Sequence, residues 1–183
     1  MPFTLSAPVH SESVIKKSRF IGCVEPMADR AAALQRVAGL RARHPGATHV
    51  CWALMAGGHS AANDDGEPGG TAGRPMLEVL RHQDLDGVLA TVVRYYGGIQ
   101  LGAGGLVRAY TDSVAQALLQ ADKVPRTVFR TLTCTVPYAL EGWLRRELTA
   151  QGATLGTVDH GQAVTVEFAV PQGAAAALVA RSD

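Results

Sequence analysis

The fold is decided by the stretch Arg94-Tyr95-Tyr96-Gly97-Gly98-Ile99-Gln100-Leu101-Gly102-Ala103-Gly104-Gly105-Leu106-Val107-Arg108-Ala109-Tyr110. An apolar run, residues 88–93, precedes it, and apolar residues recur at helical spacing after it. Its five glycines lie between those two elements, where they permit positive φ angles and a close approach of the backbone. We therefore predict a central buried strand, a glycine-rich turn and a helix in direct succession.

The glycine-rich turn predicts an anion-binding site. The first amides of a helix have no partner within it, and the helix dipole adds partial positive charge there. Arg94 and Arg108 flank the turn. The glycines concerned are Gly97, Gly98, Gly102, Gly104 and Gly105. The alternative is a tight turn in which packing excludes side chains, because one glycine-rich turn is weak evidence for a ligand.

The helix that follows the turn places Arg108 near its start. Val107 and Tyr110 are expected on the buried face, Tyr110 with its hydroxyl hydrogen-bonded in the core. Arg108 then lies off that face and can lean back toward the turn, because helical side chains point toward the helix N-terminus. The alternative for Arg108 is a salt bridge to Asp112 or to the acidic loop described below.

Composition limits the class of protein. The chain has 183 residues, 47% of them hydrophobic and 18% charged, which predicts a packed core in one large or two small domains. The formal net charge of +1 means that any nucleic-acid contact comes from local patches. Cys23, Cys51 and Cys134 lie far apart without metal-ligand spacing, so we expect buried thiols.

The sequence predicts a cytoplasmic protein without membrane contact. The first ten residues lack a charged region followed by a long apolar stretch, as a secretory signal would have. No run approaches the roughly 18 apolar residues of a membrane span.

Several enzyme classes are excluded by missing motifs. The chain has no P-loop, no zinc-protease H-E-x-x-H motif and no serine-hydrolase elbow. Residues 102–107 lack the third glycine of the dinucleotide-binding fingerprint. We expect neither a cofactor nor a metal ion.

Two further stretches carry charge. Lys16, Lys17 and Arg19 precede a predicted strand at residues 20–24, where they either contact phosphate or form a solvated strand end. Residues 64–75 form a second dense loop. The residues of interest in this acidic loop are Asp64, Asp65, Glu67, Thr71 and Gly73.

The acidic loop does not fit a metal site. An EF-hand register would place alanine, at positions 61 and 72, in the first and last ligand positions. A divalent-metal site with His59 is the minor alternative. We expect the carboxylates either to be solvated or to pair with Arg94 or Arg108.

A second series of strand and helix patterns begins after residues 123–126, which predicts two domains, 1–123 and 124–183. In the second we expect strands at 128–136, 153–158 and 163–170 and helices at 139–151 and after Pro171. The order β-α-β-β-α is a ferredoxin-like split unit without its last strand. Either the true C-terminus lies further on, or that strand is absent.

Three stretches together resemble the IMPACT family in its bacterial YigZ branch. Residues 65–73 and 94–110 resemble its two signature stretches, and residues 17–21 resemble its N-terminal motif. They occur in the family's order, and the resemblance runs from about Lys16 to Ala121. The chain departs from the family at Gly69, often serine, and at Gln100, often lysine. The first removes a hydroxyl group from residues 65–73 and the second a positive charge from the glycine-rich turn, so both argue against tight phosphate binding.

The resemblance implies a fold and a function. The first domain would be a two-layer α/β unit like a domain of a small-subunit ribosomal protein and of elongation factor G. The second would resemble the ferredoxin-like end of that factor. The family is associated with translational control, which favours a non-enzymatic protein that binds RNA or the ribosome.

Two alternatives stay open. One is an enzyme acting on a phosphorylated small molecule, with Asp64, Asp65 and Glu67 as candidates for acid–base work. The other is a protein–protein adaptor whose second domain accepts a partner strand at an open sheet edge.

Overall fold

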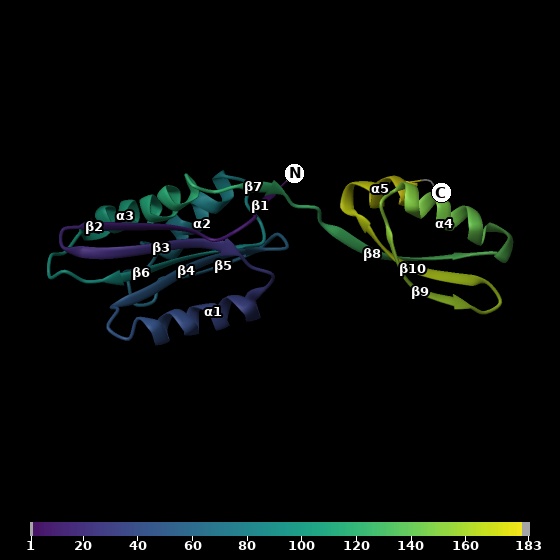
Figure 1. Cartoon of the computed structure of the whole chain (residues 1–183). Helices are drawn as coiled ribbons and strands as arrows, with labels where there is room; N and C mark the ends of the chain where they lie inside the picture. The colour runs from purple at the N-terminus through teal and green to yellow at the C-terminus, as the bar shows by residue number, and fades with distance from the viewer. Residues whose placement is uncertain (1, 181–183) are drawn as a thin grey trace. The chain divides into compact units, whose positions relative to one another are not determined.

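The computed structural model describes residues 2–180 and divides into two compact units between Arg126 and Thr127 (Figure 1). Both units combine helices and strands, so the expected mixed α and β architecture in two parts is confirmed. No helix among the described residues is both long enough and apolar enough to cross a membrane.

A five-stranded antiparallel sheet forms the centre of the first unit. Its strands, in spatial order, are β2 (Val9–Ile15), β3 (Ser18–Pro26), β6 (Val88–Tyr95), β4 (His49–Ala56) and β5 (His59–Asn63). β6 is the middle strand and is buried along its length except at Tyr95. The apolar run before the glycine-rich turn therefore occupies the central position that the sequence predicted.

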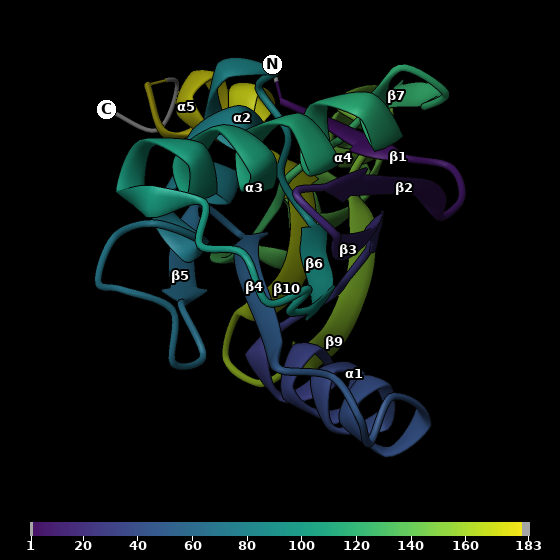
Figure 2. The ribbon, with the colours of Figure 1, turned by 90° about the vertical axis from the view of Figure 1, so that its left-hand side faces the viewer.

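Helices cover both faces of this sheet, as Figures 1 and 2 show. The helix α1 (Arg30–Arg43) lies on one face, and α2 (Gly73–His82) and α3 (Gly102–Leu118) lie on the other. The expectation of two layers is corrected here: α1 adds a third.

The reason for the third layer is visible along β4. Trp52 and Leu54 pack with the buried residues of α1, whereas Cys51 and Ala53 belong to the core under α2 and α3. A strand that is apolar on both faces needs cover on both.

At the start of α3, the buried position is Leu106, one residue before the predicted Val107. Leu106, Ala109 and Tyr110 are buried, whereas Val107 is 38% exposed, so the expectation that Val107 faces the core was wrong. Tyr110 is fully buried, as predicted. Leu106 takes the core position because it lies one helical turn before Tyr110 on the same face.

Two short strands, β1 (Phe3–Leu5) and β7 (Lys123–Pro125), pair antiparallel at the edge of the first unit. The second unit follows with its own sheet in the order β8-β10-β9. Its elements are β8 (Phe129–Val136), η1 (Tyr138–Leu140), α4 (Glu141–Ala150), β9 (Thr154–His160), β10 (Val164–Pro171) and α5 (Gln172–Ala180).

In the second unit β10 lies between β8 and β9 and runs antiparallel to both. This is the split β-α-β arrangement of the ferredoxin-like fold. No fourth strand follows among the residues described up to 180, in agreement with the sequence prediction. Leu144 and Leu148 of α4 pack on the sheet as the core of this unit.

Candidate functional site

The basic cluster and the glycine-rich turn are adjacent. Lys16 and Lys17 form the two-residue connection between β2 and β3, and both have positive φ angles, 46° and 64°. Such angles suit a tight hairpin turn, although few residues other than glycine adopt them. A Cβ atom on Gly97 would overlap the Lys17 carbonyl group. Gly97 is therefore required for the two loops to touch, and its N–H donates to Ser18 Oγ at 3.2 Å.

Arg94 does not present its guanidinium group to solvent. It ends β6 with 4% of its surface exposed. Its Nη1 donates to Glu67 Oε1 at 2.5 Å and its Nη2 to Ser18 Oγ at 3.2 Å. The guanidinium carbon lies 5.4 Å from the ring centre of Phe20 and 5.5 Å from that of Tyr96. Arg94 Nε is buried without a hydrogen-bond partner among the described residues.

Glu67 is the centre of a buried polar network. Its Oε1 accepts from Arg94 and from the Tyr110 hydroxyl at 2.9 Å, and lies 3.3 Å from His49 Nε2. His49 Nδ1 donates to the Asp65 carbonyl at 2.7 Å, because a carbonyl only accepts. Burial raises the pKa of the Tyr110 hydroxyl, which keeps it protonated as a donor. Of the alternatives left open for the acidic-loop carboxylates, pairing with Arg94 is the one that Glu67 forms.

The other two carboxylates of the acidic loop hold the loop itself. Asp64 accepts from the backbone N–H groups of Gly70, Ala72 and Gly73, at the start of α2. Burial alone would raise the pKa of Asp64, but these three amides together hold it below its ordinary value. Asp65 accepts from the Val50 N–H at 2.7 Å and pairs with Arg41 at 3.0 Å.

Thr71 and Gly73 are also structural. The Thr71 hydroxyl donates to the Pro68 carbonyl at 2.6 Å, and a Cβ atom on Gly73 would lie 2.7 Å from the Asn63 nitrogen. Of the acidic-loop residues singled out from the sequence, Glu67 lines the cavity described below.

The N-terminus of α3 is open. Leu101 caps it without a side-chain hydrogen bond, and the N–H groups of Gly102, Ala103 and Gly104 have no acceptor among the described residues. Gly98 and Gly104 have open space around them, whereas Gly105 lies against Leu101.

Arg108 is exposed one turn into α3. No hydrogen bond or ion pair joins it to another described residue, so the alternative salt bridge to Asp112 or to the acidic loop is not formed. Arg19 is exposed as well, but it pairs with Glu12 at 2.6 Å.

A cavity of about 380 Å³ joins the buried network to the start of α3. This volume falls within the range of small-ligand pockets. The residues that line it are Thr48, His49, Glu67, Pro68, Arg94, Tyr96, Gln100, Leu101, Gly102, Ala103 and Leu106.

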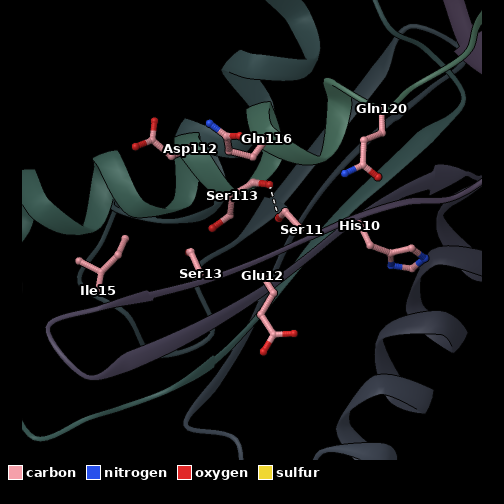
Figure 3. Close-up of a pocket in the computed structure, with 9 residues that line it drawn as sticks. All are labelled: His10, Ser11, Glu12, Ser13, Ile15, Asp112, Ser113, Gln116 and Gln120. Atoms are coloured by element: carbon pink, nitrogen blue, oxygen red, sulfur yellow. Dashed lines mark hydrogen bonds between the residues drawn. The ribbon is translucent and has the colours of Figure 1, made fainter.

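A slightly larger cavity, about 420 Å³, lies between β2 and α3 (Figure 3). None of the site residues predicted from the sequence lines it. Figure 3 shows Ile15 and Asp112 at one end of it and His10 and Gln120 at the other. Because Lys16 follows Ile15 and Arg108 precedes Asp112 by one helical turn, Lys16, Lys17 and Arg108 lie toward the same end of the unit.

Within residues 2–180 no three histidine, cysteine or acidic side chains are grouped as metal ligands would be.

Residues 16–118 match the Impact N-terminal domain. The chain belongs to the IMPACT family. Residues 134–181 match a second family, described as a domain of unknown function, DUF1949. The resemblance to the family is thereby confirmed.

Curated members of the IMPACT family are similar to most of the chain. IMPACT family member YvyE of Bacillus subtilis is 38% identical over 173 residues, 93% of this chain and 80% of that protein. IMPACT family member YigZ of Escherichia coli is 42% identical over 159 residues, 84% of this chain and 74% of that protein. A crystal structure known only as that of a hypothetical protein superposes with a TM-score of 0.76 at 37% identity, over 98% of this chain and 89% of its own.

Two residues that line the cavity in this IMPACT-family chain, His49 and Tyr96, were not among the site residues predicted from the sequence. His49 bonds to backbone at the start of β4 through Nδ1, and its second nitrogen faces Glu67. A histidine at a strand end beside an acidic loop was the available signal. Tyr96 was likewise not singled out, although it lines the cavity.

Proposed function

We propose that this IMPACT-family chain binds the phosphate backbone of RNA, free or within the ribosome. The observation that carries the proposal is the contact between Lys17 and Gly97, which brings the basic hairpin turn against the glycine-rich turn. Two features that are weak evidence separately therefore form one surface.

Three exposed cations supply the charge of this surface: Lys16, Lys17 and Arg108. No acidic partner of any of the three is present among the described residues, so each is available to a phosphate. The open amides of Gly102 and Ala103 add neutral donors at the positive end of α3. Contacts of this kind position RNA without reading its sequence.

Arg94 takes an indirect part in this proposal. Because its guanidinium is paired with Glu67 and buried, it holds the acidic loop against the end of β6 rather than binding phosphate itself. Arg19 contributes only when its exposed pair with Glu12 opens. Of the phosphate contacts predicted from the sequence, the proposal keeps those at the hairpin turn, at the start of α3 and at Arg108.

The family connects this binding to the regulation of translation. IMPACT proteins are associated with translational control, so we propose ribosomal RNA or another RNA of the translation apparatus as the partner. The same proposal places the protein in the cytoplasm.

The test is the salt dependence of RNA affinity. For a single-stranded RNA, the logarithm of the binding constant falls with the logarithm of salt concentration by roughly 0.7 for each phosphate contact. Lys17→Asn removes one cation at a position where asparagine tolerates the positive φ angle. We expect weaker binding and a slope smaller by about 0.7.

Lys123→Asn is the matched control, because Lys123 is an exposed lysine on β7, which Figure 1 shows far from the β2–β3 turn. It should bind as the wild type does. RNA affinity of the wild type that is indifferent to salt would contradict the proposal.

A second candidate function, an enzyme acting on a phosphorylated small molecule, is favoured by one observation. Glu67 and His49 face one another at 3.3 Å and line the cavity beside the open α3 amides. Asp64 and Asp65 already accept hydrogen bonds from backbone amides, so Glu67 and His49 would act as the general acid and base. A screen of phosphorylated metabolites tests it: the absence of turnover would contradict this function, and turnover that persists in Glu67→Gln would remove Glu67 from the mechanism.

An adaptor role for the second unit remains a separate proposal. β8 pairs with β10 on one side only, and no described strand covers its other edge. A strand from a protein partner fits such an edge. A strict monomer without partners in pull-down experiments would contradict this role.

A further inference from the structure

We propose that the cavity beside the glycine-rich turn takes one guanine base, either unpaired within RNA or in a free nucleotide. The inference rests on the proposed function in its RNA form, because the base would belong to the strand whose phosphates the surface holds. It goes beyond that function by giving the protein a preference for one base.

Tyr96 provides the surface on which a base stacks. Its side chain is 47% exposed and lines the cavity. The Arg94 guanidinium carbon lies 5.5 Å from its ring centre, and the Tyr96 N–H donates to Thr48 Oγ1 at 2.9 Å. Both contacts fix the tyrosine before any ligand arrives. Stacking on such a fixed aromatic ring is the usual way in which proteins hold unpaired bases.

Glu67 provides the group that reads the base. Its three neighbours, Arg94, Tyr110 and His49, all reach the same oxygen, Oε1. Oε2 is therefore the carboxylate atom left for a ligand. An ionised carboxylate only accepts hydrogen bonds, so it selects an edge that donates.

Guanine has the matching edge. Its N1–H and N2–H₂ groups are adjacent donors, whereas the corresponding edges of adenine and cytosine alternate a donor with an acceptor. Uracil offers one N–H between two carbonyl groups. Gln100 lines the same cavity and carries an amide that can donate to guanine O6. A carboxylate and an amide together distinguish guanine from the other three bases.

Arg94 gives an independent indication that the cavity serves a ligand. Its Nε–H is buried without an acceptor among the described residues, and the residue lines the cavity. Folded proteins leave few buried donors unpaired. Gly102 and Ala103, whose amides are open, line the same cavity, and these amides would hold the phosphate attached to the base.

The test compares labelled RNAs that differ at one position. An oligouridine with a single central guanosine is measured against the same strand with adenosine, inosine or uridine there, by fluorescence anisotropy at one salt concentration. We expect guanosine to bind about tenfold more tightly than adenosine or uridine. Inosine, which lacks the N2 amine, should fall between them. GMP should compete more strongly than AMP.

Two variants assign the preference to the cavity. Glu67→Gln should abolish the preference for guanosine over adenosine and uridine. Because that substitution removes the buried partner of Arg94 and can unfold the unit, Tyr96→Leu serves as the second variant. It should lower affinity for the guanosine strand roughly tenfold. Tyr138→Leu, at a tyrosine of similar exposure in the second unit (52% against 47%), is the control and should change nothing.

The outcomes separate this inference from the proposed function. Salt-dependent binding of all four strands with equal affinity would overturn the guanine site and leave phosphate binding intact. Preferential binding of GMP without binding of any RNA would support the base site and overturn the RNA surface. A guanosine preference that survives Tyr96→Leu unchanged would overturn the placement of the base in this cavity.

Discussion

The Arg94 guanidinium donates to the Glu67 carboxylate across 2.5 Å, with both side chains almost wholly removed from solvent. The pair joins the end of the central strand to the acidic loop 27 residues earlier in the chain. Ion pairs in the interior are costly to break, because the partner that remains keeps an uncompensated buried charge. This pair therefore links the two stretches that identify the family.

Arg94→Gln should destabilise the first unit. The substitution leaves Glu67 buried without its cation, which costs on the order of 3–5 kcal/mol. Urea unfolding at neutral pH measures the loss, followed by the fluorescence of Trp52 in β4 in a Trp143→Phe background that removes the tryptophan of the second unit.

Arg19→Gln is the matched control for this variant. It breaks the same type of pair, with Glu12, but half of each side chain there is exposed, 50% and 55%. Solvent screens such a pair, so the unfolding free energy should stay close to that of the wild type. Equal losses in the two variants would show that burial does not decide the strength of the Arg94–Glu67 pair.

Asp64 should make the first unit less stable as the solution becomes acidic. Its pKa is held below the ordinary value in the folded chain, so the unfolded state binds protons more readily as the pH falls. The stabilisation is complete above the unfolded pKa of about 3.9 and is lost as the pH falls through the folded pKa.

Asp64→Asn tests this dependence. Asparagine keeps an acceptor oxygen for the amides at the start of α2 but does not titrate. The stability advantage of the wild type over the variant, measured as urea midpoints between pH 7 and pH 3, should shrink as the solution becomes more acidic. An advantage that stays constant over that range would assign the role of Asp64 to geometry alone.

Local patterns predicted most of the elements because each depends on neighbouring residues. The apolar run at residues 88–93 gave β6, and the apolar residues at helical spacing after the glycine-rich turn gave α3. The third layer was missed because single-strand patterns do not say which element covers a second apolar face. The packing of Trp52 under α1 decides that in space.

The site could be predicted only in parts. The cations and glycines were identified one stretch at a time, but the contact of Lys17 with Gly97 depends on the pairing of β3 with β6. The pairing of a carboxylate with Arg94 was expected from charge. The sequence does not say which carboxylate pairs with Arg94. The folded loop leaves Glu67 for this role, because Asp64 and Asp65 accept hydrogen bonds from backbone amides.

Gly97→Ala and Gly104→Ala should have opposite effects. A methyl group at Gly97 overlaps the Lys17 carbonyl, so the two loops must separate and the unit should lose more than about 1 kcal/mol. Gly104 lies in α3 with open space around it, where alanine should add roughly 0.5–1 kcal/mol. Thermal unfolding compares the two, and a Gly97→Ala protein as stable as the wild type would argue against a close contact of the loops.

Arg108→Gln should separate binding from folding. Arg108 is exposed, makes no ion pair with another described residue and lies one turn into α3, toward the same end of the unit as Lys17. Its loss should leave the unfolding midpoint nearly unchanged, weaken RNA binding and reduce the salt slope by about 0.7, the value for one phosphate on a single strand. Combined with Lys17→Asn, the slopes should fall additively, because the two cations would hold different phosphates. If Arg108→Gln unfolds readily while its folded fraction binds RNA normally, Arg108 is a structural residue and the phosphate surface ends at the hairpin turn.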